Sequence, residues 1–156
     1  MIRPTLPEDV SELIELATAT KVFKPNEIMA LEEVLADYVE EPGGPGYHSY
    51  TLVEQGAICG FSIHGPNTMT VGTWDLYWIA VRPQRHRAGL GSKLLHFAEE
   101  DVRKQRGRLL LIETSSLPSY APTRNFYLKH GYNQVATVPD FYADGDSLVI
   151  FGKRLR

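Results

Sequence analysis

Residues 77–95 read Y-W-I-A-V-R-P-Q-R-H-R-A-G-L-G-S-K-L-L. An apolar, aromatic and β-branched run ends at Val81, which is typical of a strand. A basic loop that begins at Pro83 comes next. The sequence G-L-G-S then leads into apolar residues at helical spacing, beginning with Leu94 and Leu95. The predicted order is strand, glycine-rich turn and helix.

A turn of this kind suits an anion. The first amides of a helix have no partner within it, and they carry the positive end of the helix macrodipole. Glycine lets a bulky anion approach the backbone closely. Four basic side chains in this segment add positive charge: Arg82, Arg85, Arg87 and Lys93. The stretch therefore predicts a pyrophosphate site, although its spacing matches neither G-x-G-x-x-G nor G-x-x-x-x-G-K-[ST].

The turn itself reads H-R-A-G-L-G from residue 86. It resembles motif A of the GNAT N-acetyltransferase superfamily, written [RQ]-x-x-G-x-[GA], in which the backbone binds the pyrophosphate of acetyl-CoA. His86 replaces the family's Arg or Gln, and we expect binding to survive because the contacts are mainly to amides. A solvated basic turn that only caps a helix is the alternative. The resemblance implies that acetyl-CoA is a cosubstrate and that it contacts His86, Arg87, Ala88, Gly89, Leu90, Gly91 and Ser92.

A second segment, residues 126–132, reads F-Y-L-K-H-G-Y. It is similar to the F-Y-x-K-x-G-F/Y element of GNAT motif B, in which a short helix ends at a glycine and the chain returns as a strand. The resemblance implies that Tyr127 lies beside the sulfur of CoA, with a purely structural core aromatic as the alternative. Tyr120 and Thr123 stand where many members have Asn and Ala. Tyr120 is therefore expected beside the pantetheine in the position of that asparagine.

Hydrophobic periodicity divides the chain into strands and helices. Strands are predicted at residues 2–4, 49–54, 57–64, 74–81, 109–114, 132–138 and 148–154. Helices are predicted from residue 7, from residue 25 or 26, over 89–105 and over 120–130, and an acidic loop over 139–146.

The resulting order, β-α-α-β-β-β-α-β-α-β-β, is the order known for GNAT folds. The resemblance thus covers almost the whole chain. It implies one α/β (α+β) GNAT-like domain over residues 1–156. In such a domain a mixed, mostly antiparallel central sheet of about seven strands is flanked by about four helices.

Composition narrows the class of protein. The chain has 156 residues, of which 43% are hydrophobic and 22% charged, as in one ordinary globular domain. Its net charge of -3 argues against a nucleic-acid partner. No membrane-length apolar run, no signal peptide and a single cysteine, Cys59, predict a cytoplasmic protein with no membrane partner. No metal is expected, because five histidines are scattered without zinc-ligand spacing. They are His48, His64, His86, His96 and His130.

Acetyl transfer from a thioester to an amine requires a neutral amine, a polarised carbonyl and a proton for the departing thiolate. The resemblance implies that Tyr127 supplies the proton, and a phenol with a pKa of about 10 suits a thiolate with a pKa of roughly 8–9. For the carbonyl, the family uses backbone amides where the central strand separates from its neighbour. Here they fall near Ile79, Ala80 and Val81.

A carboxylate or water must accept the proton of the amine. Asp75 has the same strand parity as Ile79 and Val81, so we expect these three side chains on one face of the sheet. The opposite face is then filled by Trp74, Leu76, Trp78 and Ala80. Asp75 also matches the position of the glutamate base in some protein-acetylating GNAT members. Glu113 on the following strand is the rival, water stays open, and Asp75 could instead pair structurally with an arginine.

Two classes of function follow. The first is an enzyme that transfers acetyl to a primary amine by direct attack in a ternary complex, the acceptor being a small amine, an amino acid or a peptide amine. The second is a non-catalytic CoA-binding regulatory module with the same fold. The family's acceptor site corresponds to residues 23–29, Asp75, Tyr77 and 140–146. Family habit also predicts a homodimer, with Phe141 and Tyr142 at its contact.

Overall fold

The computed structural model of the protein describes the backbone of residues 1–156 and the side chains of residues 1–85 and 89–156. The strands are β1 (Ile2–Pro4), β2 (His48–Glu54), β3 (Ala57–Pro66), β4 (Thr73–Val81), β5 (Leu109–Ser115), β6 (Asn133–Ala143) and β7 (Asp146–Arg154). The α-helices are α1 (Val10–Ala19), α2 (Pro25–Glu40), α3 (Leu90–Lys104) and α4 (Ala121–Lys129). Short 3-10 turns, η1 (Pro7–Asp9), η2 (Pro83–Ala88) and η3 (Pro118–Tyr120), precede α1, α3 and α4.

The strands form one sheet in the order β1-β2-β3-β4-β5-β7-β6. Neighbouring strands are antiparallel except β4 and β5, which are parallel. The α/β fold and the order of elements predicted from the sequence are confirmed. In the described part of the chain, no helix is long and apolar enough to span a membrane.

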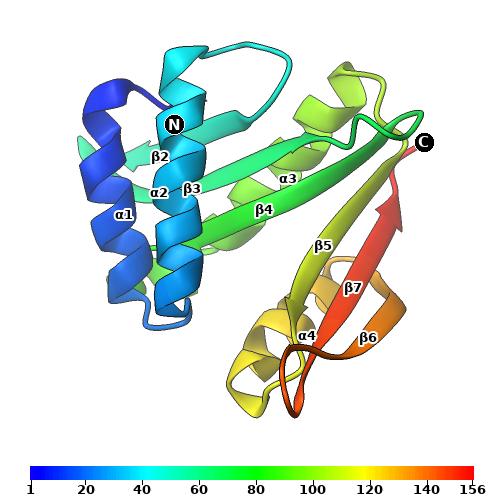
Figure 1. Cartoon of the computed structure of the whole chain (residues 1–156). Helices are drawn as coiled ribbons and strands as arrows, with labels where there is room; N and C mark the ends of the chain where they lie inside the picture. Colours follow the sequence, from blue (N-terminus) through cyan, green and yellow to red (C-terminus); the bar gives the residue numbers. More distant parts are fainter.

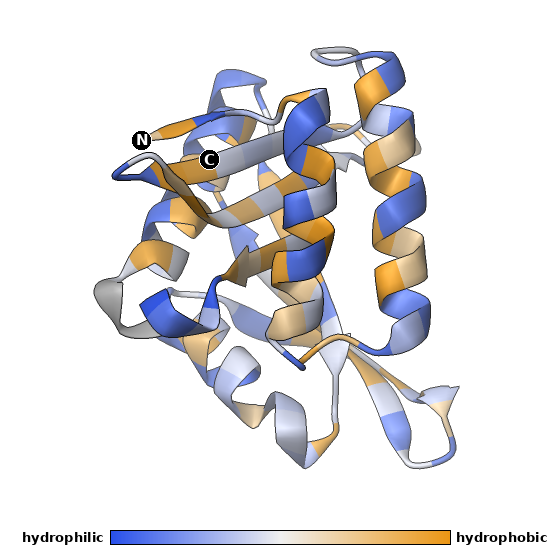
Figure 2. Ribbon diagram, turned by 90° about the vertical axis from the view of Figure 1, so that its left-hand side faces the viewer, coloured by the Kyte–Doolittle hydropathy of each residue, from blue (hydrophilic) through white to orange (hydrophobic). Residues whose placement is uncertain are grey.

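Helices cover both faces of the sheet (Figure 1). On one face, α1 and α2 pack Leu13, Leu16, Leu31 and Leu35 against β3 and β4. Hydrophobic and hydrophilic bands alternate along these helices in Figure 2, as expected for helices with one buried side. Helix α2 begins at Pro25, whose missing N–H is not needed at that position.

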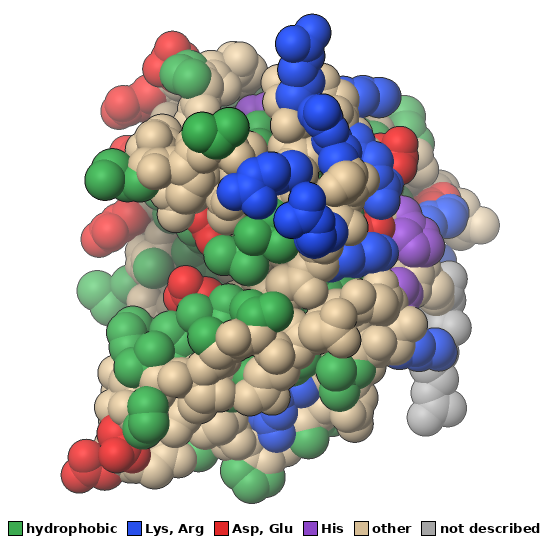
Figure 3. All heavy atoms as spheres, turned by 90° about the vertical axis from the view of Figure 1, so that its right-hand side faces the viewer, with side chains coloured by type: hydrophobic (Ala, Val, Ile, Leu, Met, Phe, Trp, Pro, Cys, Tyr) green, Lys and Arg blue, Asp and Glu red, His purple; other side chains and the backbone are tan. Residues whose placement is uncertain are grey.

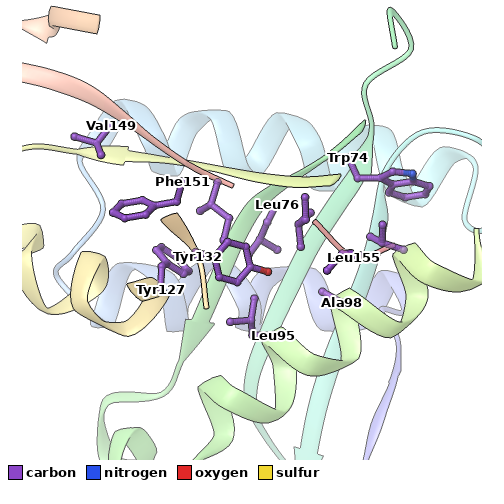
Figure 4. Close-up of a cluster of buried hydrophobic side chains, with 12 residues drawn as sticks. Trp74, Leu76, Leu95, Ala98, Tyr127, Tyr132, Val149, Phe151 and Leu155 are labelled. Carbon is purple, nitrogen blue, oxygen red and sulfur yellow. The ribbon is translucent and has the colours of Figure 1, made fainter. Parts of the chain in front are cut away.

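The opposite face carries α3 and α4. Figure 4 shows Leu95 and Ala98 of α3 and Tyr127 of α4 directed into one core, in which Leu76 of β4 and Phe151 of β7 also lie. This core therefore joins β4, the first strand of the parallel pair, to β7 of the C-terminal hairpin. Both cores meet at β4, which explains why this strand is apolar along almost its whole length.

Strands β4 and β5 are paired over only part of their length. The parallel register runs from Thr73 opposite Leu109 to Leu76 opposite Ile112. Beyond these residues β5 stays paired with β7, while β4 stays paired with β3. The two strands diverge, and Figure 1 shows the resulting V-shaped gap in the sheet.

Strand β4 has one extra residue opposite β3. Ile63 pairs with Trp78 and His64 pairs with Leu76, so the register skips Tyr77. This is a β-bulge, and an extra residue reverses the alternation of side chains beyond it.

The bulge overturns the predicted facing of β4. Ile79 packs toward α3 with Leu76, whereas Ala80 packs under α1 and α2. Asp75, next to Leu76 and before the bulge, points to the face of Ala80, so its predicted shared face with Ile79 and Val81 is wrong. The prediction assumed that side chains alternate along the whole of β4. A bulge interrupts this alternation, and it can be recognised only from the register with the partner strand β3.

The predicted loop over 139–146 is mostly strand. Strand β6 continues to Ala143 and β7 begins at Asp146, so only Asp144 and Gly145 form the turn. The register jumps between Val138 and Ala143, which accommodates the extra residues as a bulge. Within it, Asp140 has a φ of 54°, and its Oδ1 accepts a 2.8 Å hydrogen bond from the N–H of Gly145. The polar composition was interpreted as a loop because the pairing of a bulged hairpin leaves no period-two pattern.

Charged side chains are distributed unevenly over the surface. Figure 3 shows Lys and Arg side chains gathered over the upper part of one face, beside hydrophobic side chains lower down. Arg106 and Arg108 follow α3 in the chain, and Arg154 and Arg156 lie at its C-terminus. Arg156 Nη1 donates to Arg106 O at 3.2 Å, which holds these two segments together.

Candidate active site

A cleft of about 660 Å³ occupies the gap between β4 and β5. It is lined from both faces of the sheet: Ile79 belongs to the α3 face, whereas Trp78 belongs to the α1–α2 face. The N-terminus of α3, the connector between α1 and α2, and helix α4 also contribute. The cleft therefore passes through the plane of the sheet.

One end of the cleft is the N-terminus of α3. Gly89 has a left-handed φ of 71°, and its carbonyl accepts the helix bond from Lys93 N at 3.2 Å. The amides of residues 90–92 precede this bond and are not used inside the helix. Gly89, Gly91 and Ser92 line the cleft, whereas the Leu90 side chain is buried in a separate core. The predicted contacts of His86, Arg87 and Ala88 lie outside the described residues.

Ser92 is held by a histidine. Its Oγ lies 2.8 Å from His130 Nε2, and His130 Nδ1 lies 2.8 Å from the carbonyl oxygen of Phe126. A carbonyl only accepts, so Nδ1 carries the proton, and Ser92 donates its hydroxyl proton to Nε2. This fixes the first turn of α3 against the end of α4.

Two of the basic residues near the turn are occupied elsewhere. Arg82 Nε donates to Ile58 O at 3.0 Å, and its Nη2 lies 3.8 Å from Glu12 Oε2. Lys93 Nζ lies 3.2 Å from Glu54 Oε1. Neither side chain lines the cleft, so an anion there would depend on the α3 amides rather than on these two cations.

Tyr127 is part of the lining of the cleft. Its ring packs between Phe126, Tyr132 and Phe151 with centroid separations of 5.6–6.0 Å, and only 4% of the residue is exposed. Burial raises the pKa of the phenol well above its usual value, so the hydroxyl stays protonated throughout the neutral range. The ring is thus a core aromatic and a cleft residue at once.

Tyr120 also lines the cleft, but its hydroxyl is engaged. The oxygen lies 2.8 Å from Val22 O and 3.0 Å from Glu27 Oε1, and the phenol has one proton to donate between them. Tyr120 therefore joins η3 to the connector before α2 and to its first turn. Its ring, rather than its hydroxyl, is what remains for a ligand.

The three predicted backbone donors of β4 all line the cleft. Arg82 N donates to Cys59 O at 2.7 Å, and antiparallel ladders bond alternate residues, so the N–H of Ala80 also points to β3. The N–H of Ile79 points the other way, toward β5, which no longer pairs with β4 at this level. By the same alternation the N–H of Val81 has the orientation of the Ile79 N–H, so both amides are directed away from β3.

The α1–α2 side of the cleft is acidic and aromatic. Glu113, Tyr77 and Tyr142 line it, whereas Asp75 lies behind them and is not part of the lining. Burial raises the pKa of the Glu113 carboxyl, and the charge of Asp75 raises it further. Burial and the nearby Asp75 also raise the pKa of Tyr77 to about 12. Between the two candidate bases, the geometry favours Glu113 because it reaches the cleft.

A lysine crosses the mouth of this side. Lys24 Nζ lies 2.6 Å from Asp146 Oδ2 and 4.6 Å from the centre of the Tyr142 ring. Ser115 Oγ donates to the other oxygen of Asp146. The connector before α2 is thereby tied to the start of β7, across the cleft.

Comparison with known proteins agrees with this fold. A family model described as an acetyltransferase (GNAT) domain matches residues 45–134. A crystal structure of a protein from Desulfovibrio desulfuricans, assigned to the GNAT acetyltransferase family, has 36% sequence identity and a TM-score of 0.95 and covers 100% of this chain and 99% of that one. This chain belongs to the GNAT acetyltransferase family.

More distant GNAT structures share the fold. The ribosomal-protein-S18-alanine N-acetyltransferase from Escherichia coli has 20% identity and a TM-score of 0.79, and the match covers 99% of this chain and 93% of that one. An aminoglycoside 6'-N-acetyltransferase in complex with coenzyme A has 18% identity and a TM-score of 0.76, with 100% and 97% coverage. No curated protein sequence matched the chain.

The residues present fit the acetyl-CoA that GNAT enzymes use. The α3 amides around Gly91 offer an anion site, where a built Cβ would come within 3.4 Å of the Phe126 ring, so space beside the backbone is limited. Tyr127 and the Ile79 amide lie further along the same cleft. His130 was missed by sequence reasoning, and so was the contact between Lys24 and Asp146, although both of these residues lie in the predicted acceptor segments 23–29 and 140–146. His130 lies inside motif B and could have been suspected from it, but the contact of Lys24 with Asp146 spans 122 residues and has no local signal.

Proposed function

We propose that this GNAT protein transfers an acetyl group from acetyl-CoA to a primary amine by direct attack within a ternary complex. The observation that carries the proposal is the cleft through the sheet. An amide-rich helix start lies at its α3 end, a carboxylate and aromatic rings line its α1–α2 side, and Tyr127 with the Ile79 amide lies between them.

Each residue has a role that its position supports. The N–H groups of residues 90–92 bind the pyrophosphate. The Ile79 N–H donates to the carbonyl oxygen of the acetyl group, where negative charge develops during attack. Tyr127, whose phenol is protonated at neutral pH, donates its proton to the leaving thiolate.

Glu113 is the proposed acceptor for the proton of the incoming ammonium. Its raised pKa makes it a stronger base than an exposed glutamate, and it lies on the side from which the amine enters. Asp75 does not line the cleft, and its negative charge raises the pKa of Glu113. Direct proton removal by Asp75 or by water is the second possibility that the experiments below separate.

The acceptor class follows from the lining of the cleft. Carboxylate and aromatic side chains attract an ammonium group, and here they are Glu27, Tyr77, Trp78, Glu113 and Tyr142. The two distant relatives described above are named for an alanine amine of a protein and an amine of an aminoglycoside. A small amine, an amino acid or a peptide amine is accordingly the acceptor that we propose.

Thiol release distinguishes an enzyme from a CoA-binding module. Purified protein with acetyl-CoA is incubated with a panel of amines, amino acids and peptides, and free CoA is measured with a thiol reagent. We expect at least one amine to accelerate release and to appear in acetylated form by mass spectrometry. CoA binding by calorimetry without acceleration by any amine would instead support the regulatory module.

A further inference from the structure

Three side chains from three elements meet on the α3 face, outside the cleft. His48 begins β2, His64 lies near the end of β3, and Asp101 lies near the end of α3. His48 and His64 are register partners, with ring centroids 5.4 Å apart. Their Nδ1 and Nε2 atoms lie 2.8 and 2.7 Å from the same oxygen, Asp101 Oδ2. The sequence interpretation of these two histidines as scattered is therefore wrong, because strand register and not local spacing brings them together.

The surroundings of this cluster are apolar but accessible. The Trp74 ring lies 5.1 Å from His48 and 5.9 Å from His64, and the Tyr50 ring stacks on His64 at 5.8 Å. Tyr50 also donates to Asp101 Oδ1 at 3.3 Å, which orients the carboxylate. Asp101 is also part of the lining of a surface groove of about 350 Å³ along α3, whereas the two histidines are not.

The cluster has no part in the proposed acetyl transfer. Asp101 follows Ser92 by nine residues on α3, which corresponds to about 14 Å along the helix axis. Placing two imidazoles and a carboxylate in an apolar setting is costly unless their polar atoms are used. His64 is fully buried.

We propose that His48 Nδ1, His64 Nε2 and Asp101 Oδ2 bind a zinc ion, with a fourth position open toward the groove. These three atoms all lie within 4.8 Å of one another. Two imidazole nitrogens and one carboxylate oxygen, with a water in the fourth position, form a zinc ligand set. A metal binds an imidazole in its neutral form.

Zinc requires the ligand atoms to move. Zinc bonds of about 2.0–2.1 Å in a tetrahedron separate two ligand atoms by about 3.3 Å. The two histidine–carboxylate separations, 2.8 and 2.7 Å, must lengthen by roughly half an ångström. The two imidazole nitrogens, which lie within 4.8 Å of each other, must stand at about the same 3.3 Å, so the partly exposed His48 ring has to turn toward His64 as Asp101 withdraws. The ion would replace the protons that now lie between each imidazole and the carboxylate.

The second nitrogen of His64 gives an independent observation. Zinc at Nε2 places the ring proton on Nδ1, and metal-bound imidazoles use that N–H for an outer hydrogen bond. His64 Nδ1 and Ser62 Oγ are the buried side-chain polar atoms without a hydrogen-bond partner in the described part of the chain. They belong to the same face of β3, two residues apart, so one water bridging them would satisfy both.

Zinc titration tests the proposal without reference to acetyl transfer. Protein dialysed against a chelator is titrated with zinc sulfate by calorimetry. We expect one zinc ion per chain and a rise in melting temperature. Cobalt is expected to give the visible absorption bands of a tetrahedral site and, because Trp74 is adjacent, to quench its fluorescence.

Matched variants identify the ligands. His48→Ala removes a partly exposed ligand, and Asp101→Asn removes the charge while keeping the shape. Each is expected to weaken zinc binding by more than the roughly 10- to 100-fold that loss of an outer-shell partner causes. His96→Ala changes an exposed histidine on the same helix and should bind zinc as wild type does. Circular dichroism checks that the variants fold. CoA binding is a second check, because the proposed CoA site lies at the other end of α3.

Two outcomes overturn the proposal. One is the absence of zinc binding by the wild-type protein at micromolar concentration. The other is equal binding by wild type, His48→Ala and Asp101→Asn, particularly if His96→Ala loses it, because the zinc is then an adventitious surface ion. In either case the three side chains form only a hydrogen-bonded cluster that joins the β2–β3 hairpin to α3.

Discussion

Replacing Gly89 by alanine tests the backbone conformation at the start of α3 alone, because the added methyl group has free space. Gly89 has a φ of 71°, and a Cβ built there meets no atom within 4 Å. The cost of Gly89→Ala is therefore conformational, about 1–2 kcal/mol for an L-residue in the left-handed region. A chain of this size loses about 2–4 °C in melting temperature per kcal/mol, so we expect a decrease of roughly 2–8 °C.

The same substitution affects CoA, because the chain can escape the strain by rotating out of the left-handed region. Rotation misdirects the amides that follow Gly89. Loss of one hydrogen bond to a charged group corresponds to about 1.5–3 kcal/mol. At 1.4 kcal/mol per factor of ten, this weakens CoA binding by roughly 10- to 100-fold. Gly89→Val should be worse, since a β-branched residue is least tolerated at positive φ.

Gly56→Ala is the matched control. Gly56 has a φ of 77° and no atom within 4 Å of a built Cβ, but it lies in the β2–β3 turn, away from the cleft. Both variants are compared by thermal melting and by CoA calorimetry. A similar loss of stability with loss of affinity only in Gly89→Ala supports the anion site. Equal CoA affinity in Gly89→Ala, Gly56→Ala and wild type would refute the reasoning.

Further predictions address chemistry and assembly. Tyr127→Phe should lower the turnover number by about ten- to ten-thousand-fold with CoA affinity nearly unchanged, and full activity in steady-state assays would remove the acid role. Because the charge of Asp75 raises the pKa of Glu113, Asp75→Asn should lower that pKa and shift the acidic limb of the pH–rate profile to lower pH, while Glu113→Gln should abolish that limb. An unshifted profile in Asp75→Asn together with an intact limb in Glu113→Gln would leave water as the base. We also propose a homodimer through the edge strand β6, on which Val135, Val138 and Phe141 are exposed, and Val138→Lys should dissociate it in light scattering. A monomeric wild-type mass at micromolar concentration would contradict this.

The order of elements could be predicted because it depends on local signals. Proline at the start of α2, the glycines near α3 and the apolar periods of the helices each lie within one short window. The cleft lining from β4 and α4 could be placed for a different reason, since one family motif follows β4 at the start of α3 and the other lies at the end of α4. Residues such as Ile79 and Tyr127 were thereby located before any contact was known.

The remaining features depend on pairing between distant segments. The skipped residue Tyr77 exists only relative to β3, and it moved Asp75 to the other face of the sheet. The meeting of His48 with His64 follows from the register of a hairpin, and the Lys24 contact follows from the closing of the whole domain. None of these has a period or a motif along the chain. Sequence reasoning found the elements that form the site and missed the contacts between distant segments that define its walls.

The extra residue of β4 makes the two sides of this strand insensitive to a change in its length. Removing Tyr77 would place Trp78 directly after Leu76 in a regular ladder with β3, because Ile63 already pairs with Trp78 and His64 with Leu76. Trp78 would still face α1 and α2, and Ile79 would still face α3. A single codon deletion at this point would therefore take the Tyr77 ring out of the cleft lining while leaving the two sides of the strand as they are.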